Sequence, residues 1–373
     1  MGLASTCREV LFEEAAPLRL ERGGSLAPVE VAYETYGRLD PDAANCVVIH
    51  HALTGDANAA GHHGNPEWPG WWDNMIGPGK PVDTDRYFVV SSNLLGGCQG
   101  TTGPGSLDPA TGRPYGLRFP QFTVRDLVEV QRALLRRLGV ERPLAAMGGS
   151  LGGMQALQWA LDHPGELRAA LLLCASGRLS DQNIAFSAVA RRAIMTDPDF
   201  QGGDYYGTGR VPERGLAVAR MMAHITYLSE ESMRRRFDRQ HTDGGPRYDM
   251  GVDFEVERYL HHQGDSFLRR FDANTYLYLT RVMDYFEPFA DDGVPGRLPA
   301  VDTRFLVVSF STDWRFDASH SRGIVEGLAG AAGPVTHRDV ASPHGHDSFL
   351  LHVPEYHGLV DAFLTDAYRA AVS

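Results

Sequence analysis

The feature that most constrains the fold is the pentapeptide Gly148-Gly149-Ser150-Leu151-Gly152, which lies between an apolar run and a helical pattern. The run Leu144 to Met147 predicts a buried strand, and Leu151 to Asp162 predicts a helix that stops before Pro164. A G-x-S-x-G sequence in a strand-turn-helix context is typical of a serine nucleophile on a sharp turn, above a positive helix N-terminus. We therefore predict that Ser150 is a nucleophile, rather than an incidental serine in a glycine-rich turn.

Strand and helix patterns alternate on both sides of this pentapeptide. Thr123 and Asp126 predict the start of a helix that Gly139 ends, which places a crossover helix between two strands. This alternation predicts an α/β fold with a mostly parallel central sheet and flanking helices. The other predicted strands are Val29 to Tyr36, Cys46 to His50, Tyr87 to Ser91, Leu171 to Cys174, Phe305 to Phe310 and Pro334 to Val340, and a closing helix is predicted over Tyr356 to Val372.

The segment 180–292 interrupts this alternation. Strand signals disappear there, and the chain becomes helical and rich in charged residues. Because strand patterns resume afterwards, we predict one core domain formed by residues 1–179 and 293–373, with residues 180–292 inserted as a helical cap.

A serine nucleophile needs a base, and the base needs a carboxylate that orients it. On this kind of sheet the chain order is serine, then acid, then histidine. Asp313 follows the strand that ends at Phe310, and Asp317 is an alternative four residues later. His346 and His344 both follow the last predicted strand. The pattern alone does not choose within either pair.

The tetrahedral intermediate of acyl transfer also needs two backbone N–H groups. One is expected from Leu151, directly after the nucleophile, and the other from the loop that follows an early strand. The segment His50 to Gly55 occupies that position.

Composition excludes several classes of function. The 47 acidic and 35 basic residues give a net charge of -12, which argues against a nucleic-acid or anionic-membrane surface. The strongly apolar run Ala169 to Ala175 is too short to span a bilayer, and no secretory signal is recognisable, so we expect a cytoplasmic protein. The run His344, His346 and Asp347 lacks a known metal-ligand spacing, so we expect no metal.

Longer segments resemble the homoserine O-acyltransferases of the α/β-hydrolase superfamily over nearly the whole chain. The segments are HALTG (51–55), PGWWDNMIGPGKPVDTDRYFVV (69–90), NLLGGCQGTTGP, GGSLGGMQALQWA, ARMMAHITYLS, RFDANTYLYLT, STDWRF and PHGHDSFL. This resemblance implies a triad of Ser150, Asp313 and His346, with the N–H groups of Leu53 and Leu151 as the oxyanion hole. It also implies a homodimer joined through the cap, and substrates rather than a cofactor: an acyl-CoA and L-homoserine.

The resemblance further assigns the acceptor pocket. Arg220 would hold the homoserine carboxylate and Asp347 its ammonium group, with Tyr227 and Thr54 as additional pocket residues. A zwitterion needs one cation and one anion, which agrees with this pairing. A surface ion pair is the alternative interpretation of Arg220.

The acyl donor is predicted from Arg315, two residues after Asp313. The sequence Asp313-Trp314-Arg315-Phe316 resembles the branch that uses succinyl-CoA, in which an arginine at this position lies close enough to the acyl site to meet a carboxylate. A buried arginine facing a neutral acetyl group would lack a partner, which also favours succinyl-CoA. An ion pair with Asp313 or Asp317 is the alternative role. The prediction is a homoserine O-succinyltransferase with a ping-pong mechanism, in methionine biosynthesis. The alternatives are a homoserine O-acetyltransferase, an L-serine O-acyltransferase and a serine esterase.

Overall fold

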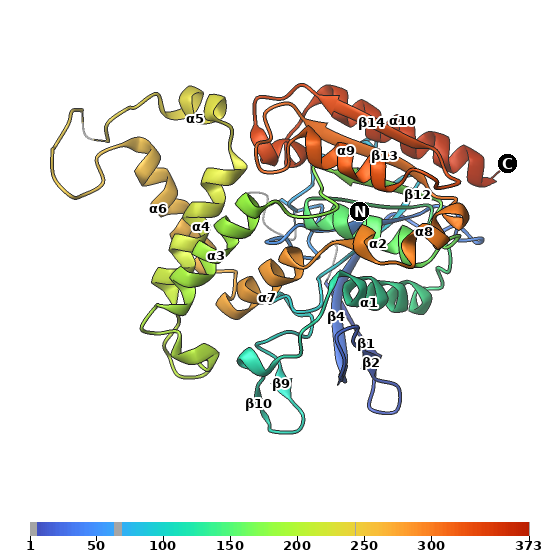
Figure 1. Cartoon of the computed structure of the whole chain (residues 1–373), viewed down its shortest axis with the longest axis horizontal. Coiled ribbons are helices and arrows are strands. Elements are labelled where there is room, and N and C mark those ends of the chain that lie inside the picture. The colour runs from blue at the N-terminus through green and yellow to red at the C-terminus, as the bar shows by residue number, and fades with distance from the viewer. Residues whose placement is uncertain (1–5, 63–68, 243, 373) are drawn as a thin grey trace.

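The computed structural model describes residues 6–62, 69–242 and 244–372, which surround one eight-stranded sheet (Figure 1). The strand order is β1-β4-β8-β5-β11-β12-β13-β14, and all neighbours from β8 to β14 are parallel. The predicted mostly parallel sheet is therefore confirmed. The strands are β1 (Cys7–Phe12), β4 (Val29–Tyr36), β5 (Cys46–His50), β8 (Phe88–Ser92), β11 (Ala145–Gly149), β12 (Ala169–Leu173), β13 (Arg304–Phe310) and β14 (Val335–Val340).

Helices cover both faces of the sheet, since successive strand residues point to opposite sides. One buried cluster joins the sheet to α1 (Val124–Arg137), α2 (Leu151–Asp162) and α9 (Ala318–Gly327). The other joins the opposite face to α10 (Pro354–Val372). The sheet is thus the middle of three layers, and the expected flanking helices are confirmed.

Helix α1 illustrates how the sequence sets these elements. Thr123 and Asp126 form the predicted capping box at its start, and Gly139 adopts a left-handed φ of 82° just beyond its end. The residues Leu127 and Leu134 are buried on one stripe of the helix. The helix therefore fits against the sheet along its apolar side.

Between β12 and β13 the described chain adds no strand to the main sheet. It forms α3 (Asp181–Met195), α4 (Glu213–Tyr227), α5 (Glu230–Phe237), α6 (Glu255–Leu268) and α7 (Ala273–Asp284). Helix α4 packs against both α3 and α6. Figure 1 shows α3 to α6 grouped to one side of the sheet. This is the segment predicted as an inserted cap, and we refer to its five helices as the cap helices.

The structure also has antiparallel pairing that the sequence analysis did not predict. Strand β1 runs antiparallel to β4, and β4 runs antiparallel to β8. The β1 strand was missed because it is an edge strand whose six residues are exposed or half-buried, so its apolar signal is weak. The short elements are β2 (Leu18–Arg19), β3 (Ser25–Leu26), β6 (Ile76–Gly77), β7 (Val82–Asp83), β9 (Leu107–Asp108), β10 (Arg113–Pro114), α8 (Val294–Arg297), and 3-10 turns at Gly116–Arg118, Gln201–Gly203, Pro288–Ala290, Leu298–Ala300 and Gly345–Leu350.

The long segment before β6 is tied to the C-terminal part of the chain. Trp72 is fully buried, and its indole Nε1 donates a hydrogen bond of 2.8 Å to the carbonyl of Phe349. Their rings also meet edge to face. This contact fixes the turn Gly345–Leu350, which carries His346.

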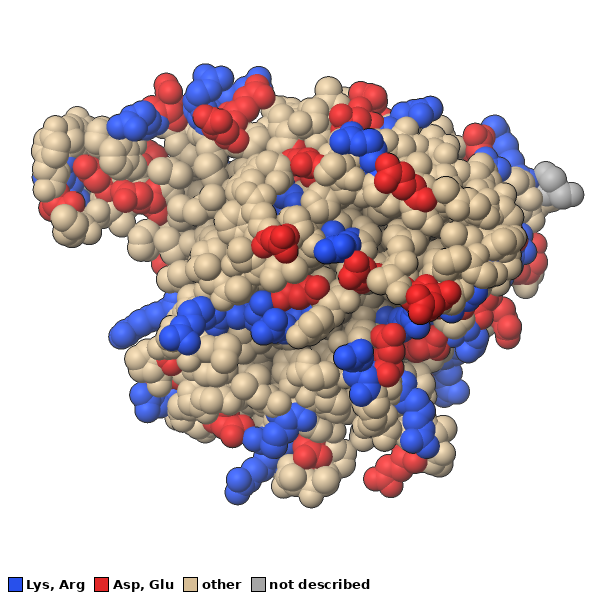
Figure 2. All heavy atoms as spheres, in the orientation of Figure 1, with Lys and Arg blue, Asp and Glu red and all other residues tan. Residues whose placement is uncertain are grey.

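Charge is distributed over the surface in both signs. Figure 2 shows acidic and basic side chains interspersed on the face it displays. None of the described helices combines the length and apolar character that crossing a membrane requires.

Candidate active site

The predicted nucleophile lies on a strained turn at the carboxyl end of β11. Ser150 adopts φ 57° and ψ −121°, and its N–H donates a 2.9 Å hydrogen bond to the carbonyl of Leu173. A Cβ atom on Gly148 or Gly152 would come within 2.4 and 2.1 Å, respectively, of the His50 carbonyl oxygen. Only glycine fits at both positions, because β5 and the turn approach backbone to backbone. The pentapeptide thus holds a left-handed serine above the sheet.

The structure places Asp313 and His346 in direct contact. The Nδ1 of His346 lies 2.7 Å from Oδ2 of Asp313, and both side chains are buried. The other carboxylate oxygen of Asp313 accepts two backbone hydrogen bonds of 2.9 Å, from the N–H groups of Arg315 and Phe316. When the imidazole carries its proton on Nδ1, it donates a hydrogen bond to this carboxylate, and Nε2 is left free to accept a proton.

Aromatic rings fix the orientation of the imidazole. The ring of His346 lies 5.2 Å from that of Phe316, 5.9 Å from that of Tyr227 and 6.0 Å from that of Phe349. Phe349 also packs on Gly149, where an added Cβ would lie 2.4 Å from its ring. The histidine and the nucleophile turn therefore share one packed wall. The serine hydroxyl makes no hydrogen bond to any described residue, as is common before substrate binds.

The rival acid and base have other surroundings. Asp317 caps the start of α9 by accepting a 2.7 Å hydrogen bond from the N–H of Ser319. The backbone N–H of His344 donates to the hydroxyl of Ser342 at 3.4 Å, and the structure gives its imidazole no contact with either aspartate. Of the four candidates, the structure brings together only Asp313 and His346.

A buried thiol lies beside this pair. Potential ligand atoms of Cys174, Asp313 and His346 all fall within 4.8 Å of one another, an arrangement that could hold a metal ion. Burial and the charge of Asp313 raise the pKa of the Cys174 thiol well above its ordinary value, which disfavours the thiolate that a metal would need. We therefore interpret the histidine and carboxylate as a hydrogen-bonded pair.

The candidate oxyanion donors lie at the ends of β5 and β11. Leu151 is the first residue of α2, and the first N–H groups of a helix have no acceptor within it. Leu53 lies inside the turn closed by the hydrogen bond of 3.0 Å from the Gly55 N–H to the Ala52 carbonyl. Both leucines are buried, and they follow the two adjacent strands β5 and β11.

Arg220 comes from α4 and reaches the loop after β5. Its Nη1 donates to the hydroxyl of Thr54 at 3.3 Å. The guanidinium also lies over two rings, 4.6 Å from the centre of Phe267 and 5.8 Å from that of Tyr227. Within the described residues Arg220 has no acidic partner at ion-pair distance. The structure therefore does not support the alternative interpretation of Arg220 as part of a surface ion pair.

Asp347 is half-buried and has neither a hydrogen bond nor an ion pair among the residues described. Burial raises its pKa from the ordinary value, while the charges of His346 and Arg220 act in the opposite direction. A carboxylate without a partner in this position can accept hydrogen bonds from a ligand ammonium group. Arg220 and Asp347 thus leave one free charge of each sign near the histidine.

Arg315 is buried, and among the described residues its side chain hydrogen-bonds to a neutral group and forms no ion pair, although its charge acts on Asp284. Its Nη1 donates to the hydroxyl of Thr226 at 2.9 Å, and its guanidinium lies 5.7 Å from the centre of the Tyr227 ring. Its side chain forms no ion pair with Asp313 or Asp317. The alternative role considered from the sequence, a local ion pair with either aspartate, is therefore wrong.

Sequence reasoning assigned no role to Arg270, which the structure brings to the same loop. Its Nη1 donates to the carbonyl of Thr54 at 2.8 Å. It was missed because it lies 216 positions away in sequence, although the segment RFDANTYLYLT that it begins was part of the family resemblance.

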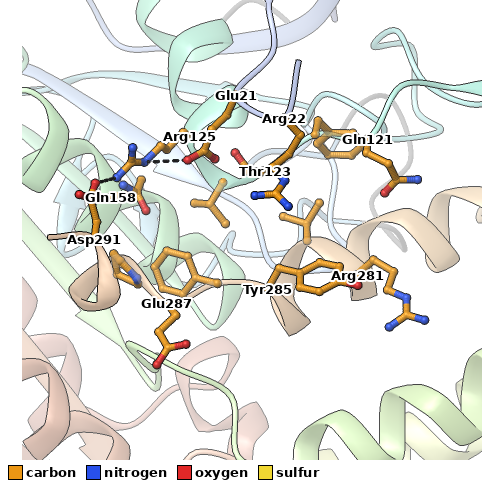
Figure 3. Close-up of a pocket in the computed structure, with 15 residues that line it drawn as sticks. Glu21, Arg22, Gln121, Thr123, Arg125, Gln158, Arg281, Tyr285, Glu287 and Asp291 are labelled. Carbon is orange, nitrogen blue, oxygen red and sulfur yellow. Dashed lines mark hydrogen bonds and ion pairs between the residues drawn. The ribbon is translucent and has the colours of Figure 1, made fainter. Parts of the chain in front are cut away.

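A large cavity lies elsewhere. It has a volume of about 760 Å³ and is lined by α1, the end of α7 and the loop around Asp291 (Figure 3). Arg125 crosses its wall to pair with Glu21 and Asp291. None of the predicted site residues lines it, and its acids are largely paired with arginines. We assign the chemistry to the buried pair because geometry, not cavity size, decides reactivity.

Comparison with known proteins agrees with this geometry. The family described as alpha/beta hydrolase fold matches residues 45–353. The chain is 53% identical over 379 residues to a homoserine O-succinyltransferase of Magnetococcus marinus, covering 99% of this chain and 96% of the relative. It is 55% identical to a homoserine O-succinyltransferase of Nocardioides sp., covering 98% and 99%. It is 51% identical to a homoserine O-acetyltransferase of Rhodospirillum rubrum, covering 94% and 91%.

Solved structures give the same fold. The homoserine O-acetyltransferase from Bacillus anthracis superposes with a TM-score of 0.89 at 27% identity, covering 98% of both chains. Esterase E22 superposes with a TM-score of 0.86 at 28% identity, covering 96% of this chain and 100% of its own. Transferases and esterases thus share this fold, and the acceptor and donor pockets must distinguish them.

Proposed function

Since the chain belongs to the homoserine O-acyltransferase family of the alpha/beta hydrolase fold, we propose that it transfers a succinyl group from succinyl-CoA to the hydroxyl of L-homoserine. The products are CoA and O-succinyl-L-homoserine, an intermediate of methionine biosynthesis. The triad residues are Ser150, Asp313 and His346, and succinyl-CoA is a co-substrate, so the scheme requires no bound cofactor.

The observation that carries the choice of donor is the buried guanidinium of Arg315. A buried charge without an ionic partner is destabilising, and a bidentate carboxylate is the ligand that best satisfies a guanidinium. The free carboxylate of a succinyl group supplies such a partner, whereas an acetyl group leaves the guanidinium without a carboxylate at hydrogen-bond distance. Arg315 contacts Thr226 and Tyr227, and the ring of Tyr227 also packs against His346, so the guanidinium lies close to the catalytic pair.

In the first half-reaction Nε2 of His346 removes the proton of the Ser150 hydroxyl as its oxygen attacks the thioester carbonyl. The N–H groups of Leu53 and Leu151 donate to the oxyanion. The intermediate then collapses, the carbon–sulfur bond breaks, and the protonated histidine gives its proton to the CoA thiolate. A succinyl ester on the serine remains.

In the second half-reaction homoserine occupies the pocket beside the histidine. Arg220 binds its carboxylate and Asp347 its ammonium group, with Thr54 and Tyr227 completing the pocket. His346 removes the hydroxyl proton as the oxygen attacks the acyl-enzyme, and returns that proton to Ser150. The cap helices of residues 180–292 exclude water, which favours transfer over hydrolysis.

We also propose that two copies of the chain associate through the cap helices and act in the cytoplasm. Helices α3 and α4 present apolar side chains to solvent, and a stable dimer would cover them. The exposed fractions are 53% for Val189, 53% for Met195, 46% for Val218 and 43% for Ile225. A monomeric mass in light scattering, unchanged by Val218→Asp, would contradict this interface.

The donor assignment is tested by comparing succinyl-CoA and acetyl-CoA with L-homoserine as acceptor. Replacing Arg315 by leucine is expected to lower kcat/KM for succinyl-CoA by about 100-fold, because a charge-assisted pair contributes about 1.5 to 3 kcal/mol. The value for acetyl-CoA is expected to stay the same or rise. Arg322→Leu, an exposed arginine on α9, is the matched control.

Two results would change this assignment. Preference of the wild-type protein for acetyl-CoA would make it an O-acetyltransferase like the Rhodospirillum rubrum relative. CoA release at the same steady rate with and without homoserine or L-serine would make it an esterase-like hydrolase, while a preference for L-serine would change only the acceptor.

The role of Asp347 gives a separate prediction. Replacing it by asparagine is expected to raise KM for homoserine about tenfold or more, since the ammonium group loses its ionic partner. The rapid first release of CoA should keep its amplitude, because acylation of the serine does not involve the acceptor. Stopped-flow detection of the free thiol measures both, and loss of the rapid release would instead place Asp347 in acylation.

A further inference from the structure

Arg270 lies two residues beyond the end of α6 and is anchored at both ends. Its carbonyl accepts hydrogen bonds from the amide of Gln99 and, at 3.7 Å, from the thiol of Cys98. Its guanidinium Nη1 donates to the carbonyl of Thr54 at 2.8 Å. The side chain is therefore held against the loop after β5, beside the acceptor pocket.

A second arginine reaches the same place. Arg220 donates to the hydroxyl of Thr54, and the two guanidinium groups share the ring of Phe267, at 4.6 Å for Arg220 and 5.5 Å for Arg270. Neither has an acidic partner at ion-pair distance among the residues described. Desolvation, and after it the charge of Arg220, lowers the pKa of Arg270 from its ordinary value, while the charge of Asp56 acts in the opposite direction without an ion pair.

The neighbouring His224 reports the same excess of positive charge. Burial, followed by the charges of Arg220, Arg236 and Arg270, lowers its pKa to about 3. Arg236 likewise forms no ion pair within the described chain and lies over the ring of Tyr259, at 4.3 Å. Like charges repel when they are gathered at one site, so this site favours an anionic ligand.

The homoserine carboxylate accounts for only one of these arginines. Arg220 is half-buried, whereas Arg270 as a whole residue is exposed, although its guanidinium is partly desolvated by its contacts. The remaining substrate is the acyl donor, whose thioester must reach the serine while its phosphate-bearing nucleotide end stays outside the pocket. Phosphate oxygens are strong acceptors for a guanidinium.

We propose that Arg270 binds a phosphate group of the acyl-CoA donor at the entrance of the active site, with Arg220 kept for the acceptor. This inference rests on the proposed function, because it assumes an acyl-CoA donor. Arg270 then contributes to binding of the donor, while Arg315 recognises the acyl group and the triad performs the transfer.

The test compares two donors with the same acyl thioester. Succinyl-CoA carries the phosphates, and the succinyl thioester of N-acetylcysteamine lacks them. Arg270→Gln is expected to raise KM for succinyl-CoA about tenfold, as for the loss of a charge-assisted hydrogen bond. KM for the short thioester and for homoserine should not change, and the effect should shrink as ionic strength rises. Arg269→Gln, the adjacent exposed arginine, is the matched control.

Other outcomes overturn the proposal. Equal loss with both donors would show that Arg270 only supports the Thr54 loop, and an increase in KM for homoserine alone would assign it to the acceptor. Calorimetric titration with free CoA separates this proposal from the proposed function, since it needs no transfer. Weaker CoA binding by Arg270→Gln without any acyl transfer by the wild type would refute the function and leave the phosphate site standing.

Discussion

Replacing Ser150 by alanine is expected to lower kcat for succinyl transfer by about 10⁴-fold or more, with little change in stability. The substitution removes only the hydroxyl group. Within the described chain this group forms no hydrogen bond, so its loss should not destabilise the fold. Without it no acyl-enzyme can form. Any remaining rate must come from direct attack by homoserine in the same pocket.

Mass spectrometry of the intact protein gives the direct measurement. The wild-type chain mixed with succinyl-CoA, in the absence of homoserine, should gain the mass of one succinyl group, and the alanine variant should gain none. Ser176→Ala is the matched control, since this buried serine follows β12 but hydrogen-bonds with His320. A succinyl adduct retained by the Ser150 variant would exclude the serine nucleophile.

The nucleophile turn could be predicted from sequence because every signal for it is local. The glycines around Ser150 and the proline after α2 lie within a few residues of the elements that they delimit, and the predicted bounds of α2 match those observed, Leu151–Asp162. The buried strands were equally clear, since a parallel sheet covered on both faces requires continuous apolar runs.

The choice between neighbouring acids and bases could not be made from sequence. Asp313 and Asp317 follow the same strand. Asp313 accepts one hydrogen bond from His346 and two from backbone N–H groups, while Asp317 caps a helix. Only the path of the loop after β13 separates them, and that path depends on packing with the turn that carries His346. The family resemblance selected the same pair by position, without giving the physical reason.

Contacts between distant segments also could not be predicted from local sequence patterns. Arg315 hydrogen-bonds to Thr226, which lies 89 positions away in sequence. Arg220 and Arg270 meet because α4 packs against α6. The edge strand β1 was missed for a related reason, since it gains its order from pairing with β4 rather than from its own apolar residues.

Replacing Asp313 by asparagine is expected to lower kcat by about 10⁴-fold while leaving the fold intact. An amide can keep the hydrogen bonds from the backbone N–H groups of Arg315 and Phe316 through its oxygen. Its NH₂ group then faces Nδ1 of His346 as a donor, which favours the tautomer that carries the proton on Nε2. That tautomer cannot remove the proton of Ser150, and the imidazolium loses its stabilising carboxylate.

Asp317→Asn provides a matched control of the same chemistry four residues away. Asparagine caps a helix about as well as aspartate, so this variant should retain both stability and activity. The measurements are kcat with succinyl-CoA and homoserine, the rate of serine acylation, and Tm for all three proteins. Acylation should be slowed in Asp313→Asn alone, because Nε2 acts as the base in that step. Similar activity in the two variants would mean that the carboxylate of Asp313 orients a loop rather than the imidazole, and that His346 obtains its tautomer from another group.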